Sequence, residues 1–184
     1  MSKKYGPWHI IERITKYENR FGLAVYEDKV LRPDGKEGIF GWVKIGDGIS
    51  ILPVNKDLNI YLGKEFQYGL GEECLEPSSG GIGAEEDIEV AAKRELKEEL
   101  GITAKQLIYL GYTNPISGRI NTKQHMFIAY DLKFGKQELE STEIIGKIKM
   151  PLEKAVELVM NNKIKDTQSS LLILMTNNYF NHRK

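Results

Sequence analysis

Residues Gly80–Ile102, with the sequence GGIGAEEDIEVAAKRELKEELGI, contain the most informative pattern in this chain. Their spacing predicts a glycine-rich loop followed by a helix over residues 86–100. Acidic residues at 85–87 favour the positive N-terminal end of such a helix, and Gly101 is a typical residue at which a helix ends. The segment therefore predicts a loop, a helix and a stop in direct succession.

One face of this predicted helix combines apolar residues with carboxylates. At about 100° per residue, that face carries Ile88, Ala91, Ala92, Glu95 and Glu99, with Glu98 at its edge. Inward-facing carboxylates are costly unless they bind a metal ion or meet a cation. Oxygen ligands one helical turn apart suit Mg²⁺ or Mn²⁺, which share their coordination sphere with water and phosphate groups. The alternative is a solvated face with ion pairs such as that between Glu89 and Lys93.

The complete register of the segment is more specific than its charge. Gly80 is followed after five residues by Glu86 and after seven more by Arg94-Glu95-Leu96, and single-residue gaps then precede Glu98-Glu99 and Gly101-Ile102. This arrangement resembles the Nudix box, with every position present. The resemblance implies a loop-helix-loop that binds a divalent metal ion, Mg²⁺ or Mn²⁺, and hydrolyses a nucleoside diphosphate linked to another moiety.

The resemblance also implies roles for individual residues of the box. Glu95, Glu98 and Glu99 would be the carboxylate ligands of the metal, and Glu98 would also act in catalysis. Arg94 would support catalysis by holding the loop and the helix in register. The backbone carbonyl of Ser79, just before the box, would be a further metal ligand, and backbone ligation tolerates any side chain at that position.

A later loop is the expected source of a general base. Residues 135–145 contain several glutamates ahead of an expected strand over 144–150. In the resembling branch of the family, a loop glutamate takes the proton or supports the attacking water. Glu143 is the first candidate and Glu140 the second. The alternative is that these residues are solvated acids in a flexible loop.

Candidates for substrate binding lie on both sides of the box. Gln67 stands where the family's sugar-nucleotide hydrolases often carry an arginine, so a neutral amide replaces a cation expected to hold the pyrophosphate. Glu76 matches a position that often supports the site, and a solvent-facing strand end explains it nearly as well. Arg119, with Lys123 nearby, could help to neutralise a pyrophosphate, and surface solubility explains these cations equally.

Residues 1–48 are expected to form an N-terminal β lobe, and residues 49–184 the hydrolase domain. The lobe resembles that of the ADP-ribose pyrophosphatase branch, in which a tryptophan, a Tyr/Asn pair and an Asp-Gly turn precede the hydrolase fold. The corresponding residues are Trp8, Tyr17, Asn19 and Asp34-Gly35. In that branch the lobe packs against a second subunit, so the resemblance implies a homodimer. Trp8 and Tyr26 could then stack on adenine, or simply pack in a core or an interface.

Composition narrows the possible function classes. The chain has 26 Lys and Arg residues and 26 Asp and Glu residues, so no global basic field would gather nucleic acid or an anionic membrane surface. No apolar segment approaches transmembrane length, the N-terminus leads into no signal-peptide core, and the single Cys74 excludes an internal disulfide. We therefore expect a cytoplasmic protein whose partner is a small-molecule nucleotide.

The remaining segments predict a mixed α/β fold. Expected strands cover 8–14, 21–26, 38–45, 49–54, 59–63, 106–112, 125–132 and 144–150, and expected helices begin near Pro151 and Thr167. Strands before and after a central helix favour a mixed sheet between helices. The resemblance implies the Nudix α/β/α sandwich with a β-rich N-terminal lobe.

The function that these features favour is metal-dependent hydrolysis of the pyrophosphate bond in ADP-ribose or another nucleoside diphosphate sugar, which gives a nucleoside monophosphate and a sugar phosphate. One alternative is hydrolysis of oxidised nucleoside triphosphates or of dinucleoside polyphosphates. Another is a nucleotide-sensing module without catalysis. Such sensors usually add a basic DNA-binding domain and often lose box carboxylates, whereas all of these carboxylates are present here.

Overall fold

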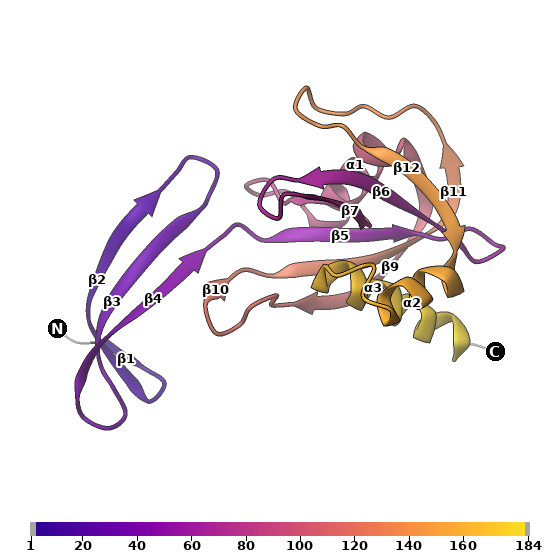
Figure 1. Ribbon diagram of the computed structural model, residues 1–184. Coiled ribbons are helices and arrows are strands. Elements are labelled where there is room, and N and C mark those ends of the chain that lie inside the picture. The colour runs from indigo at the N-terminus through magenta and orange to yellow at the C-terminus, as the bar shows by residue number, and fades with distance from the viewer. Residues whose placement is uncertain (1–2, 183–184) are drawn as a thin grey trace. The chain divides into compact units, whose positions relative to one another are not determined.

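The computed structural model describes residues 3–182, and these residues form two compact units (Figure 1). The first unit comprises the residues up to Gly46 together with Asn114–Lys123. The second comprises Asp47–Thr113 together with the residues from Gln124 onward. Residues 1–2 and 183–184, which the ranges expected from the sequence include, lie outside the described residues.

Within residues 3–46 and 114–123, the first unit is a five-stranded sheet in the order β1-β2-β3-β4-β10. Its strands are β1 (Lys3–Tyr5), β2 (Trp8–Glu18), β3 (Ala24–Leu31), β4 (Glu37–Lys44) and β10 (Ile120–Asn121). Neighbouring strands are antiparallel except for β10, which is parallel to β4. The turn between β3 and β4 has Gly35 at a φ of 79°, a left-handed conformation that favours glycine.

The loop 114–123 belongs to the first unit, whereas the sequence pattern grouped it with residues 49–184. Its short strand β10 extends the sheet, and the amide of Val43 donates a hydrogen bond to the carbonyl of Arg119 (2.8 Å). Two residues of regular strand are too few to produce a periodic pattern of apolar and polar residues. The pairing therefore depends on contacts between distant segments that the local sequence does not reveal.

The described part of the second unit contains two sheets. The four-stranded sheet has the order β8-β5-β11-β9, with β8 (Ser78–Gly81), β5 (Gly48–Pro53), β11 (Gln124–Phe134) and β9 (Ile102–Thr113). It is mixed, because β5 and β11 are parallel while the outer pairs are antiparallel. The three-stranded sheet has the order β12-β6-β7, with β12 (Gly146–Pro151), β6 (Asn59–Gln67) and β7 (Glu72–Glu76).

The helices described in the second unit are α1 (Ile88–Leu100), α2 (Leu152–Met160) and α3 (Thr167–Asn181). Successive side chains of a strand point to opposite faces of its sheet. In β5, Ile51 packs in the core that contains α1, and Leu52 packs in the core that contains α2 and α3. Helices thus cover both faces of a mixed sheet, which confirms the expected α/β/α sandwich (Figure 1). No helix among residues 3–182 combines the length and the apolar composition needed to cross a membrane.

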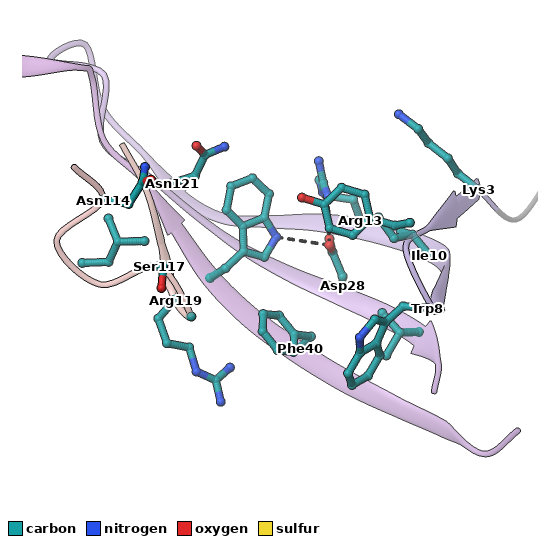
Figure 2. Close-up of a pocket in the computed structure, with 15 residues that line it drawn as sticks. Lys3, Trp8, Ile10, Arg13, Asp28, Phe40, Asn114, Ser117, Arg119 and Asn121 are labelled. Atoms are coloured by element: carbon teal, nitrogen blue, oxygen red, sulfur yellow. Dashed lines mark hydrogen bonds and ion pairs between the residues drawn. The ribbon is translucent and has the colours of Figure 1, made fainter. Parts of the chain in front are cut away.

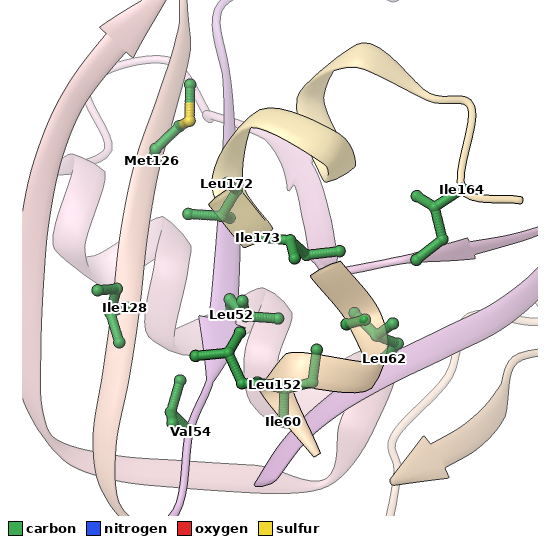
Figure 3. Packing of buried hydrophobic residues seen from close by; sticks show 11 residues of the cluster. Leu52, Val54, Ile60, Leu62, Met126, Ile128, Leu152, Ile164, Leu172 and Ile173 are labelled. Carbon is green, nitrogen blue, oxygen red and sulfur yellow. The ribbon is translucent and has the colours of Figure 1, made fainter. Parts of the chain in front are cut away.

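The core on the side of α2 and α3 is a continuous apolar cluster (Figure 3). Strands, helices and the segments next to them contribute to it the fully or almost fully buried side chains of Leu52, Val54, Ile60, Leu62, Met126, Ile128, Leu152, Ala155, Ile164, Leu172 and Ile173. Full burial of each large aliphatic side chain contributes about 1.5–3 kcal/mol. On the opposite face, Leu96 and Leu100 bury one side of α1 against β5 and β11. The box helix is therefore fixed to the sheet.

Helix α1 begins at Ile88, slightly later than the expected start at residue 86. The reason is that Asp87 is the N-cap, since its carboxylate accepts hydrogen bonds from two amides of the first turn (2.8 and 3.3 Å). The helix ends at Leu100, as expected, and Gly101 has a φ of 60°. This left-handed C-terminal cap is a position that favours glycine.

We expect Gly101→Ala to lower the free energy of unfolding by about 2 kcal/mol or more, because a φ of 60° is strained for alanine. In addition, a Cβ at Gly101 would lie 2.6 Å from the backbone carbon of Lys136. The measurement is equilibrium unfolding in urea. Gly69→Ala is the matched control, because a Cβ there has no neighbour within 4 Å, and its effect should stay within about 0.5 kcal/mol. Equal stability of the two variants would contradict the role assigned to Gly101.

Candidate active site

Arg94 is the centre of the polar network at the box. Its Nε and Nη2 donate to the two carboxylate oxygens of Glu86 (2.9 and 3.0 Å), and Nη2 also donates to the Gly81 carbonyl (3.0 Å). Its Nη1 donates to Glu95 Oε1 (2.6 Å) and to Glu98 Oε2 (3.2 Å). A guanidinium group has five N–H donors, so these contacts use its full capacity. Arg94 thus connects the glycine-rich loop to the helix and has no donor left for a substrate.

Glu86 and Arg94 form an ion pair in which each group stabilises the charged form of the other. Hydrogen bonds from Arg94, and then from the Gly83 amide, hold the pKa of Glu86 at about 2. Glu86 in turn raises the pKa of Arg94. Both groups are therefore fully charged near neutral pH, and their attraction keeps the loop on the helix.

Glu95 and Glu99 lie on the buried side of α1. Glu95 is 9% exposed, and a Cβ at Gly80 would collide with its carboxyl group, so a larger residue there would force this carboxyl group to move. Burial raises the pKa of Glu95 although Arg94 opposes this shift. Burial also raises the pKa of Glu99 to about 8, although the Ser79 amide donates a hydrogen bond to its carboxylate (3.0 Å). The charges of two acidic side chains are thus poorly compensated.

The donors on α1 suit a hard divalent cation. Glu95, Glu98 and Glu99 offer carboxylate oxygens within about one helical turn, and Ser79 lies beside Glu99. Because burial disfavours the charged forms of Glu95 and Glu99, a nearby cation would reduce this cost. Within residues 3–182, no three acidic, histidine or cysteine side chains are already gathered as a metal site, and Arg94 pairs with Glu95 and Glu98 instead. The residues therefore fit a metal ion by their chemistry.

The loop 135–145 brings one of its two candidate bases close to α1. Beyond the effect of burial, the charge of Glu143 also raises the pKa of Glu95 and of Glu99, which requires proximity. The carboxylate of Glu143 accepts a hydrogen bond from the Glu140 amide (2.9 Å). The Glu140 side chain is exposed. The charge of Glu143 thus acts on the carboxylates of the box, whereas the Glu140 side chain lies in solvent.

Gln67 and Glu76 meet on the hairpin of β6 and β7. Gln67 Nε2 donates to Glu76 Oε2 (2.9 Å) and to Glu65 Oε2 (3.2 Å). Burial, followed by the charges of Asp166 and Glu65, raises the pKa of Glu76 to about 7. Glu76 is therefore not a solvent-facing strand end. Glu65, which no sequence pattern singled out, belongs to the same group, because it also accepts a hydrogen bond from Gln67. Burial and then the charge of Glu143 raise its pKa.

Trp8 and Arg119 line a pocket of about 830 Å³ in the first unit (Figure 2). Trp8 packs edge-on against Phe40 with ring centroids 5.8 Å apart, and the Arg119 guanidinium lies 4.6 Å from the centre of the Phe40 ring. Arg119 also donates to the Gly41 carbonyl (3.0 Å). These two candidates therefore belong to the first unit, whereas the box carboxylates belong to the second.

A buried charge in the same pocket was not expected from the sequence. Asp28 is 5% exposed, and it accepts two hydrogen bonds from Arg13 (2.8 and 2.9 Å) and one from Trp42 Nε1 (3.1 Å; Figure 2). The contact with Arg13 lowers the pKa of Asp28. Tyr26 packs on Trp42 with ring centroids 4.6 Å apart. The only sequence signal is an aspartate inside a strand, where an unpaired charge would be costly.

Known proteins that resemble this chain support one family. The NUDIX domain model matches residues 44–170. The ADP-ribose pyrophosphatase of Bacillus subtilis is 31% identical over 155 residues, which cover 82% of this chain and 83% of that protein. The ADP compounds hydrolase NudE of Escherichia coli is 28% identical over 113 residues, which cover 61% of this chain and 60% of that protein.

The fold itself has a solved counterpart. A crystal structure of an ADP compounds hydrolase matches with a TM-score of 0.84 and 21% identity, over 99% of this chain and 98% of that one. Nudix hydrolases generally use divalent metal ions, which agrees with the oxygen donors on α1. The family match over most of the chain and the relative at 31% identity show that this protein belongs to the Nudix hydrolase family.

Proposed function

We propose that this enzyme hydrolyses the pyrophosphate bond of ADP-ribose or a related ADP-linked sugar, with Mg²⁺ or Mn²⁺ as cofactor, to give AMP and a sugar phosphate. The observation that carries this proposal is that Glu95 and Glu99 lie on the buried side of α1, where burial and, to a smaller extent, the charge of Glu143 on the loop 135–145 raise the pKa of both. Relatives named ADP-ribose pyrophosphatase and ADP compounds hydrolase support the choice of substrate. The partner is therefore a small nucleotide.

In this proposal the metal ion is held by residues of the box and of β8. Its ligands would be the carboxylates of Glu95, Glu98 and Glu99 and the backbone carbonyl of Ser79. When bound, such an ion neutralises charge on the pyrophosphate and makes water more acidic. Arg94 keeps the glycine-rich loop and α1 together, so that the carboxylates keep their spacing.

Glu143 would act as the general base for attack on phosphorus. A water oxygen forms a bond to one phosphorus of the pyrophosphate, and the water proton passes to a carboxylate oxygen of Glu143. The bond from that phosphorus to the bridging oxygen breaks, and the bridging oxygen leaves with the electron pair on the other phosphate. The partial burial of Glu143 close to Glu99 supports this role.

We further propose that the protein is a cytoplasmic homodimer that associates through its first unit. Large apolar side chains are exposed there, such as Phe21 (77%), Ile39 (68%) and Tyr5 (65%), and a second copy would cover them. In this dimer Trp8 and Arg119 would contact the nucleotide bound by the other subunit. The free thiol of Cys74 is compatible with a reducing compartment.

Product analysis tests the proposed reaction directly. The protein is incubated with Mg²⁺ or Mn²⁺ and a panel of ADP-ribose, ADP-glucose, GDP-mannose, UDP-sugars, NADH and nucleoside triphosphates, and the products are identified by mass. We expect AMP and ribose phosphate from ADP-ribose, formed faster than any product from a triphosphate. Release of pyrophosphate from triphosphates as the main reaction would instead support the alternative substrate class.

We expect Glu99→Gln to lower kcat/KM on the order of 10²–10³-fold with the fold retained, because a charged ligand oxygen is lost at constant size. The measurement is hydrolysis of ADP-ribose across a metal titration. Glu89→Gln is the matched control, since Glu89 is on the exposed side of the same helix, 3.9 Å from Lys93, and it should behave as the wild type. A folded Glu99→Gln variant with full activity would refute the metal assignment.

The same substitution should alter how stability depends on pH when metal is removed. The pKa of Glu99 in the folded protein is about 8, above the ordinary value of 4.5, so the folded state binds this proton more tightly than the unfolded chain. The resulting stabilisation is complete below the ordinary pKa and is lost as the pH rises through the folded-state pKa. Thermal melts in EDTA should therefore fall more steeply between these pH values for the wild type than for Glu99→Gln. Parallel curves would argue against a buried, poorly compensated charge.

If the neutral amide of Gln67 marks a missing phosphate contact, Gln67→Arg should raise kcat/KM for ADP-ribose by about tenfold, the effect of one added charge-assisted hydrogen bond. Glu65 and Glu76, which now accept from Gln67, would hold the new guanidinium in place. Gln106→Arg adds the same charge at an exposed position of β9 and serves as the control. The interpretation of Gln67 fails if the rate is unchanged or if both variants gain equally.

A further inference from the structure

The segment that carries Glu143 is attached to the end of helix α1. The last carbonyls of a helix have no partner within the helix and must find acceptable donors elsewhere. Here the Gly135 amide donates to the Gly101 carbonyl (2.7 Å), and the Glu138 amide donates to the Glu98 carbonyl (2.9 Å). The first residues of the loop therefore act as a cap on the C-terminus of the box helix.

One side chain closes this loop at its base. Gln137 Nε2 donates to the Glu99 carbonyl in the last turn of α1 (2.6 Å) and to the Ile145 carbonyl at the far end of the loop (3.1 Å). A primary amide carries two hydrogens, and both are used. Gln137 thus joins three segments: the end of α1, the start of the loop and the residue just before β12.

The far end of the loop is itself fixed to the sheet. Ile145 is 8% exposed, and its side chain packs closely on β6, where a Cβ at Gly63 would lie 3.0 Å from Ile145 Cγ2. Between Gln137 and Ile145 only a short tip remains, and the hydrogen bond from the Glu140 amide to Glu143 lies within it. The position of Glu143 relative to α1 therefore depends on how the base of this tip is held.

We propose that Gln137 is a positioning residue for the reaction: its side-chain amide fixes the base of the loop that carries Glu143 against the end of α1, and so holds Glu143 where it can take a proton from the attacking water. This inference rests on the proposed function and on the role of Glu143 as base. A general base must be within hydrogen-bond reach of the attacking water, and displacement by about 1 Å can cost on the order of 10²-fold in rate. Gln137 acts on the rate through Glu143 and does not touch the substrate.

A capping residue without a catalytic effect would also stabilise the end of α1, so the experiment must separate the two roles. Gln137→Glu keeps the size of the side chain and replaces both N–H donors by an oxygen that faces two carbonyls. Gln137→Ala removes the contact altogether. Lys136→Ala, at an exposed neighbouring position of the same loop, is the matched control.

Hydrogen exchange and kinetics are measured on these variants in the full-length protein. We expect amide exchange in residues 139–145 to accelerate in both Gln137 variants and to stay unchanged in Lys136→Ala. With ADP-ribose, kcat should fall by about tenfold or more while KM changes little, because the loss is in placement of the base and not in binding. A fall in stability without a fall in kcat would show that Gln137 is only a cap and would overturn the proposal.

A double-mutant cycle with Glu143→Gln identifies the group through which Gln137 acts. If Gln137 positions Glu143, then Gln137→Glu should have almost no further effect on kcat once Glu143 is neutral. Additive losses in the double variant would overturn the proposal. An inactive wild-type protein would refute the proposed function itself, whereas an active enzyme with unchanged loop exchange in both Gln137 variants would refute only the role of Gln137.

Discussion

Several carboxylates packed around one guanidinium group are the constraint on which this structure depends. Arg94 directs all of its donors at protein acceptors, and these acceptors come both from the glycine-rich loop and from α1. The arrangement depends on close approach, because a side chain at Gly80 would displace the carboxyl group of Glu95. The box is therefore a single electrostatic unit in which the loop conformation, the helix and the carboxylates depend on one another.

The sequence predicted those parts of the fold whose residue pattern is contained within one continuous segment. Helix α1 has a capping aspartate, an apolar stripe and a glycine stop within one segment. Its observed start and end lie within two residues of the expected range, 86–100. Strands β8 and β10 were not expected, because their residues have low intrinsic preference for strands or are too few to show alternation. They form because β8 pairs with β5 and β10 pairs with β4, which are contacts between distant segments.

The residues of the candidate site likewise comprise some that the sequence identified and others whose contacts only the structure shows. The box register was sufficient to single out Glu95, Glu98 and Glu99, because their spacing along one helix determines which face they share. The contact between Gln67 and Glu76 was not predictable, since it joins two strands whose register places Glu72 opposite Gln67 and Gly63 opposite Glu76. The contact between Asp28 and Arg13 also joins two strands, β2 and β3, and depends on their pairing. Sequence patterns thus identify residues on one element, whereas pairing between elements has to be seen in the structure.

The balance of charge in the second unit bears on how an anionic substrate could bind there. Burial raises the pKa values of Glu95, Glu99, Glu65 and Glu76, and the charge of Glu143 adds to this rise in the first three. Arg94, the cation that contacts Glu95, is already fully engaged. A pyrophosphate that approached this surface without further positive charge would be repelled. Under the proposed function, a divalent cation would compensate the carboxylates and the pyrophosphate at once. Binding of the metal and binding of the substrate would then each favour the other, because each reduces the electrostatic cost that the other faces.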